Sequence, residues 1–277
     1  MRSDLLLPTT ASPSIRVLRA IGTFGSILAL TILGASILLR LTTVFGADGG
    51  ALSQLPSDVE NAIRMVHRLS ASNVGILALV AAVLGWKNRS AVPHAMKPIM
   101  WIIAATVLLA VIGPLTPGYR FSAVTIANVV AGTVLVAACW WLRETLVVTP
   151  GPVAAWDSML SLTLVVVAVH VGLGAAASAY AVRGAHWVAF LHTGSAMLTT
   201  LLLASILWDR RLRPAMSVRV RVMAGLLGLQ LALGMVSLWM EVRPVALGFV
   251  HAMVSALLAA GLVSIAVRDN LDYQNKE

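Results

Sequence analysis

The sequence predicts an all-α, polytopic membrane protein with eight transmembrane helices, arranged as two pseudo-symmetric four-helix bundles. Of its 277 residues, 59% are hydrophobic and only 11% are charged, and the mean hydropathy is +0.90. Soluble domains are about a quarter charged, and disordered chains lack apolar side chains to bury, so both classes are excluded. Apolar runs of about 20 residues recur along the chain, and each spans a bilayer core as a helix. Only helices satisfy the backbone hydrogen bonds of such long apolar segments within lipid.

The predicted spans follow one another with short connections, so sequential helices should pack as antiparallel neighbours. They cover residues 20–39, 65–86, 99–113, 121–141, 158–182, 187–208, 220–240 and 244–267. The third span is short because Gly113-Pro114 breaks the helix. We interpret the first span as a retained helix rather than a signal peptide, since no small-residue cleavage site follows the first apolar stretch.

Basic residues set the predicted orientation. With the N-terminus inside, most of the 20 lysines and arginines fall on inner segments, and the densest group lies between Asp209 and Arg221. This bias predicts a protein of a bacterial-type plasma membrane with both termini in the cytoplasm. The net charge of +9 is then a topology signal that meets anionic lipid, and we expect no nucleic-acid partner. The single cysteine, Cys139, excludes an intramolecular disulfide.

The two halves of the chain repeat a four-helix unit. This repeat predicts an N-terminal segment, a first bundle, a linker, a second bundle and a tail over residues 1–19, 20–142, 143–157, 158–268 and 269–277. Each even-numbered span carries one polar residue near its outer end, and these are His67, Asn128, His192 and His251. Each odd-numbered span has a glycine and then an arginine at its outer end: Gly34 and Arg40, Gly113 and Arg120, Gly174 and Arg183, Gly234 and Arg243.

Two of these glycines follow a polar residue by four positions. His170 precedes Gly174 and Gln230 precedes Gly234, so each pair shares one helix face. A glycine on such a face allows a neighbouring helix or a flat ligand to approach the backbone closely. His170 could orient the edge of such a ligand, or it could hydrogen-bond Gln230 on the seventh span.

His192 and His251 form the strongest candidate site. A buried imidazole is costly in lipid and usually faces the interior of a bundle. Two imidazoles that face each other across a four-helix bundle can hold a haem iron between them. The haem carboxylates would then need cations at the interface, which Arg183 and Arg243 could supply. The alternatives are interhelical hydrogen bonds for the histidines and interfacial snorkelling for the arginines.

The first half offers a weaker site. His67 faces Asn128 rather than a histidine, and an amide is a poor iron ligand but a good hydrogen-bond partner. Haem iron in this half would therefore have His67 as its one protein ligand, with Asn128 as a further contact. Glu60, Arg64 and His67 share one helix face. This pattern indicates an interfacial salt bridge, with a proton-carrying role for Glu60 as the alternative.

The chain resembles the haem A synthase family over about residues 20–267. The resemblance is carried by the eight helices, the internal duplication, His67-Arg68-Leu69, His192, His251 and the run Leu-Ala-Leu before Gly234. It implies a haem b between His192 and His251. It also implies that the first half, with His67 as iron ligand, oxidises a methyl group of haem o to the formyl group of haem A. Glu60, one turn further out than the position of the family's glutamate, is the candidate to substitute for that catalytic carboxylate. That reaction serves terminal oxidase assembly and uses molecular oxygen, a haem o donor protein and an electron donor.

The chain departs from the family at three places. Asn128 stands where the family usually has a second histidine, Arg64 stands where it usually has a glutamate, and residues 47–50 hold no cysteine pair. These departures favour an alternative, a haem b membrane cytochrome or assembly factor without synthase activity. A third hypothesis is a transporter whose histidines relay protons, which predicts broken helices that meet at the bilayer midplane. The sequence leaves a homo-oligomer open.

Overall fold

The computed structural model describes residues 12–46, 55–115, 122–147, 158–181, 187–210, 217–240 and 244–274. These residues form eight long α-helices and two short 3₁₀ turns, and the described ranges hold no β-strand. Each of the eight helices is long and apolar enough to cross a membrane. The predicted fold class, an all-helical membrane protein with eight spans, is therefore confirmed.

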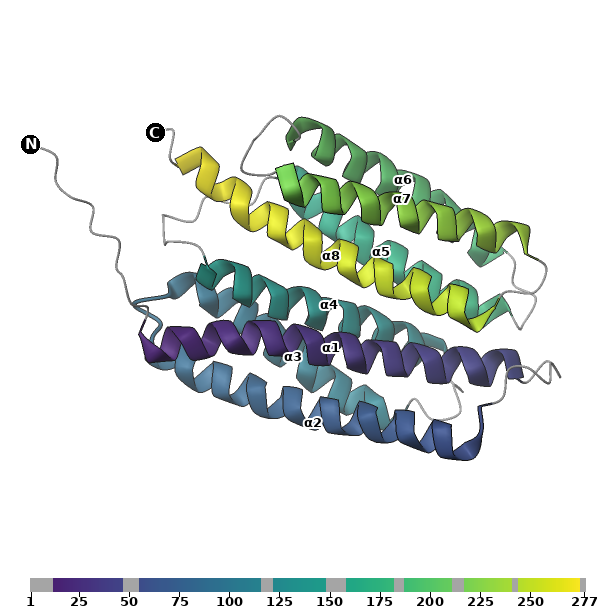
Figure 1. Ribbon diagram of the computed structural model, residues 1–277, viewed down its shortest axis with the longest axis horizontal. Coiled ribbons are helices and arrows are strands. Elements are labelled where there is room, and N and C mark those ends of the chain that lie inside the picture. Colours follow the sequence, from purple (N-terminus) through teal and green to yellow (C-terminus); the bar gives the residue numbers. More distant parts are fainter. Residues whose placement is uncertain are drawn as a thin grey trace, which may run out of the picture.

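The helices form two groups of four that lie side by side (Figure 1). The first group contains α1 (Pro13–Gly46), α2 (Ser57–Lys87), α3 (Met96–Ile112) and α4 (Ser122–Val147). The second group contains α5 (Ser158–Ala181), α6 (Trp187–Arg210), α7 (Ser217–Trp239) and α8 (Val245–Gln274). The 3₁₀ turns flank α3 at Pro93–Ala95 and Gly113–Leu115, and the second turn ends the short third span where the Gly-Pro pair predicts it.

Several helices extend beyond the predicted spans. The first begins at Pro13, where proline suits the first position of a helix. The second begins at Ser57, and its first turns carry an ion pair between Glu60 and Arg64. The fourth runs to Val147, into the predicted linker, and the eighth runs to Gln274, into the predicted tail. The apolar runs mark the membrane core, whereas the polar turns at their ends are still helical.

Helices α1, α4 and α8 form the centre of the molecule. Helix α4 packs on α5 and α8, and α1 also packs on α8, so the two groups share a continuous core. Its largest fully buried side chains on α1 and α4 are Leu18, Leu33, Ile37, Leu135 and Leu142. The peripheral helices instead expose large apolar side chains, among them Leu79, Phe190 and Trp208. Such extensive exposed apolar surface indicates contact with the lipid bilayer.

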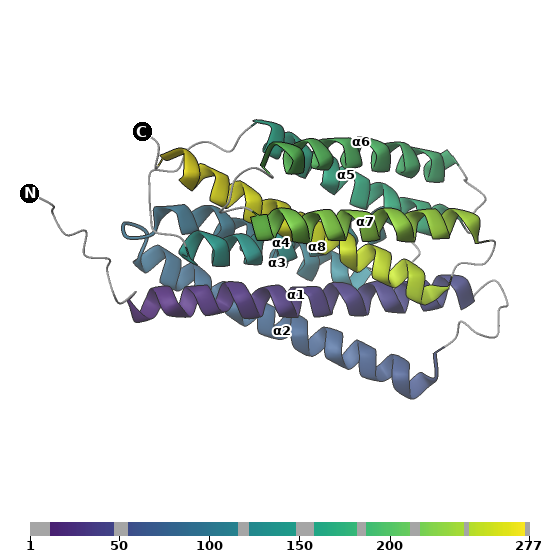
Figure 2. The same cartoon turned by 45° about the horizontal axis from the view of Figure 1, so that its top comes forward.

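A charged cluster joins the two groups at one end. The start of α1 and the end of α8 lie at this end, which we call the inner end after the predicted orientation (Figures 1 and 2). Glu144 on α4, only 1% exposed, forms ion pairs with Arg143, with Arg219 of α7 at 3.8 Å and with Arg268 of α8 at 3.4 Å. One buried carboxylate therefore links three arginines from both halves.

We expect Glu144→Gln to destabilise the protein strongly. Removing one partner of a buried ion pair leaves uncompensated charge and costs about 3–5 kcal/mol. The matched control is Glu60→Gln, because the Glu60 and Arg64 side chains are 39% and 43% exposed, and an exposed pair contributes about 0–1 kcal/mol. Thermal unfolding in detergent measures both. Equal midpoints for the two variants would contradict a structural role for Glu144.

Candidate functional site

The second half holds a cavity of about 550 Å³. Helices α5 to α8 line it, and side chains of α1 and α4 close one side. Its wall includes the last turns of α5 and α7 and the first turns of α6 and α8, so it extends to the outer end of the bundle. Most lining residues are apolar, and the volume lies in the range of about 300–1,000 Å³ that ligand sites usually have.

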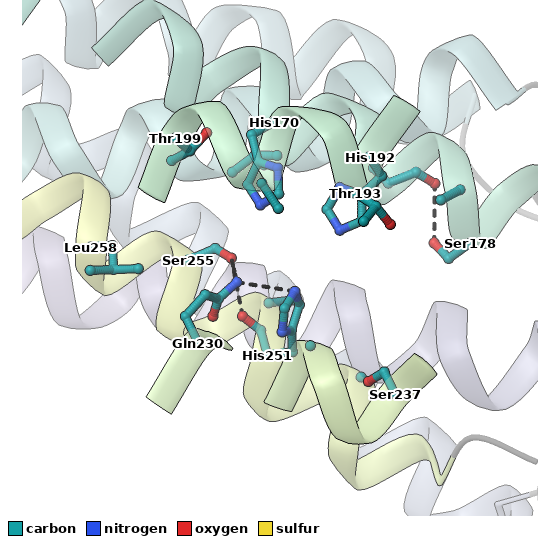
Figure 3. A pocket seen from close by; sticks show the side chains of 18 of the residues that line it. His170, Ser178, His192, Thr193, Thr199, Gln230, Ser237, His251, Ser255 and Leu258 are labelled. Atoms are coloured by element: carbon teal, nitrogen blue, oxygen red, sulfur yellow. Dashed lines mark hydrogen bonds between the residues drawn. The ribbon is translucent and has the colours of Figure 1, made fainter. Parts of the chain in front are cut away.

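His192 and His251 meet in this cavity. His192 comes from α6 and His251 from α8, and Figure 3 shows both rings projecting into the space between their helices. Their ring centroids are 6.2 Å apart and their planes are 78° apart. The structure thus brings together the two histidines that the sequence pattern paired.

Each of these histidines lies beside a glycine of the preceding helix. A Cβ atom at Gly174 on α5 would lie 3.0 Å from Cε1 of His192, and a Cβ atom at Gly234 on α7 would lie 3.7 Å from Cε1 of His251. The two repeated glycines therefore leave room for the imidazole rings. The first half lacks this arrangement in its described residues, because Gly34 faces Phe249 and Met253 of α8, and nothing lies near Gly113.

The polar residue one turn before each glycine binds a serine that follows the histidine. His170 Nδ1 lies 2.9 Å from Ser195 Oγ. The Ser195 hydroxyl donates to the carbonyl of His192 at 2.8 Å, so the ring N–H of His170 is the donor to Ser195. Contrary to one expectation from the sequence, His170 therefore bonds Ser195 of α6 and not Gln230 of α7. Its ring also stacks on His192, with centroids 4.4 Å apart.

Gln230 makes the corresponding hydrogen bonds beside His251. Its amide Nε2 donates to Ser255 Oγ at 2.7 Å and to His251 Nε2 at 3.0 Å. Because Nε2 of His251 accepts, the proton of the neutral ring is on Nδ1. The Nε2 lone pair of His251 therefore faces the Gln230 amide, and a bound metal could take the place of that amide. The Oε1 atom of Gln230 is buried and accepts no hydrogen bond.

The two histidines lie at a separation at which they could share one metal. Imidazole nitrogens bind first-row metals at about 2 Å, so two rings on opposite sides of one metal have their centres about 6 Å apart. The centroids of His192 and His251 are 6.2 Å apart, and Nε2 of His251 is bonded to Gln230. Within the described residues, no group of three or more His, Cys, Asp or Glu side chains is arranged to hold an ion. Haem needs only two protein ligands for its iron, and it needs the apolar cavity that surrounds them.

Four other candidate residues were predicted from the sequence: Arg183, Arg243, Asn128 and His67. Arg183 and Arg243 lie outside the described residues. Asn128 does not line the cavity and instead donates from Nδ2 to Ser36 Oγ on α1 at 3.3 Å. His67 on α2 is half-buried in the first half.

The predicted salt bridge on the face of His67 is present. Glu60 Oε1 accepts from Arg64 Nε at 2.9 Å and from Nη2 at 2.5 Å. Both side chains are exposed, so the pair lies at the surface of α2. A proton-carrying role for Glu60 stays a prediction.

One charged residue of the cavity was not among the residues predicted for it from the sequence. Arg40 of α1 is 6% exposed and lines the cavity, although it belongs to the first half. Its Nη1 donates to the carbonyl of Ala175 on α5 at 3.4 Å. The glycine-arginine repeat contained this residue, but its contact depends on how α1 packs against the second half. Ser195 and Ser255 were also missed, and their signal is a serine one turn after each cavity histidine.

The two glycines give a testable difference. A methyl group at Gly174 would press on His192, whose ring is held by its stack on His170, whereas Gly234 leaves ordinary contact distance. Alanine is more stable than glycine within a helix by about 0.5–1 kcal/mol. We expect Gly234→Ala to keep or raise the thermal unfolding midpoint and Gly174→Ala to lower it. A rise in both variants would show that the His192 ring moves freely.

Comparisons of the sequence with protein-family models and with curated proteins found no match.

Proposed function

We propose that this chain is an integral membrane haem protein whose second half binds a b-type haem between His192 and His251. The observation that carries the proposal is the pair of imidazoles 6.2 Å apart in an apolar cavity of about 550 Å³. Held there by both histidines, haem would supply one-electron transfer.

The residues around the two histidines would prepare them for this role. Gly174 and Gly234 leave space for the rings, and the stack of His170 on His192 limits the ring rotation of His192. Gln230 keeps the Nε2 lone pair of His251 directed at a polar partner inside the cavity. Groups that fix a ligand's orientation and tautomer in this way commonly surround metal-binding histidines.

The continuous helices support a haem site over a proton-relay transporter. The described residues of α5 to α8 run through the cavity wall as unbroken helices. Transporter sites are typically formed by discontinuous helices whose ends point at the substrate. His192 and His251 instead project toward each other from unbroken stretches of α6 and α8 (Figure 3).

A second candidate function is the oxidation of a haem o methyl group to the formyl group of haem A. The resemblance to haem A synthases suggests it, and the half-buried His67 beside the Glu60–Arg64 pair supports it. In this proposal His67 binds the iron of the substrate haem, Asn128 is a further contact, and Glu60 is the nearby carboxylate. Molecular oxygen, an electron donor and a haem o donor protein would come from outside the chain. We also propose that both termini lie in the cytoplasm of a bacterial-type cell.

The haem site is tested by its axial ligands. We expect the protein purified in detergent to show the absorption spectrum of a six-coordinate b-type haem, and His192→Ala and His251→Ala each to lose most of that haem because one axial bond is removed. His94→Ala, in the turn before α3, is the matched control and should retain it. Wild-type protein without any haem would overturn the proposal.

The second candidate is tested by identifying the extracted haems. Protein from cells that also make haem o should contain haem b together with haem A or its hydroxylated precursor, separated by chromatography with mass detection. His67→Ala should lose the oxidised haem and keep haem b, because the two sites lie in different halves. Haem b alone in the wild-type protein would reject synthase activity and leave the cytochrome function standing.

A further inference from the structure

A buried arginine of the first half reaches the cavity of the second half. Arg40 lies near the outer end of α1, and its neighbours Ile37 and Leu41 line the same cavity. Among the described residues of the cavity wall, Arg40 carries the one permanent charge. Ionisable residues inside a membrane protein are costly and usually mark a functional site.

Arg40 lies close to the support of His192. Its guanidinium donates to the carbonyl of Ala175, and Ala175 directly follows the Gly174 that faces the His192 ring. The charge is therefore placed at the α5 side of the cavity, one residue along the chain from the glycine that faces His192. A ligand that reached His192 would bring its periphery near this guanidinium.

The chemistry of a guanidinium favours one class of ligand group. Its five N–H donors lie in one plane, so it can hold a backbone carbonyl and a carboxylate together. In the low dielectric of a membrane interior, its attraction for an anion is much stronger than in water. The remaining wall offers neutral imidazole, amide and hydroxyl groups.

We propose that Arg40 binds a carboxylate of the ligand in this cavity, so that the site takes a carboxylate-bearing tetrapyrrole and is completed by a residue of the other half. The inference rests on the proposed haem site and adds to it the recognition of the acidic edge. It also explains why α1 packs against the second half at the level of the histidines. The cavity is then a composite site of both halves.

The experiment compares haem with its dimethyl ester, in which both carboxylates are neutralised. Full-length protein in detergent, stripped of haem, is titrated with each form and followed by the six-coordinate spectrum. Wild-type protein should bind the free acid more tightly than the ester. Arg40→Gln should lower that preference by about tenfold or more, since a hydrogen bond between charged groups contributes about 1.5–3 kcal/mol.

Two further variants serve as controls. Arg40→Lys keeps the positive charge and should recover part of the preference, whereas Arg89→Gln, exposed in the turn after α2, should leave it unchanged. A wild-type preference retained in Arg40→Gln would overturn the inference while the haem site stands. If Arg40→Gln fails to fold, equal affinity of the wild-type protein for acid and ester would overturn it alone. Absence of binding by either form would overturn the haem site as well.

Discussion

The surrounding lipid offers no hydrogen-bond partner, so the polar side chains inside this molecule bond mainly to one another and to the backbone. Two clusters of such side chains lie at two levels of the bundle. At the inner end, Glu144 holds three arginines of α4, α7 and α8. Toward the outer end, the cavity collects three histidines, Gln230 and several hydroxyl groups. The apolar core of α1, α4 and α8 separates the two levels and fixes their distance from each other.

The outer level is built by repetition. On both sides of the cavity, one helix supplies a polar residue and then a glycine one turn later, and the next helix supplies a histidine and then a serine. The glycine accommodates the ring, and the polar residue binds the serine. A duplicated pattern of this kind places two imidazoles opposite each other without any special loop. The first half keeps the helices of the pattern, but its Gly34 packs against Phe249 and Met253 of α8 rather than against a histidine.

Much of this arrangement follows from the sequence, and the reason is the strong periodicity of membrane helices. Eight apolar runs predict eight helices, and the repeated glycines and histidines predict which faces of α5 to α8 turn inward. The contacts of Arg40 and Glu144 do not follow in the same way. Both depend on how one four-helix group rotates against the other, and that rotation is decided by side-chain packing along α1, α4 and α8. The partner of His170 was also missed, because two neighbouring helices offered an acceptor and the sequence spacing does not choose between Ser195 and Gln230.

The placement of Arg40 has a consequence for the history of the fold. Two four-helix groups with separate sites could change or be lost independently of each other. Here α1 of the first group forms part of the wall around the histidines of the second, so loss of the first group would open the cavity of the second. The first four helices can therefore persist as a scaffold under selection even if they carry out no chemistry of their own.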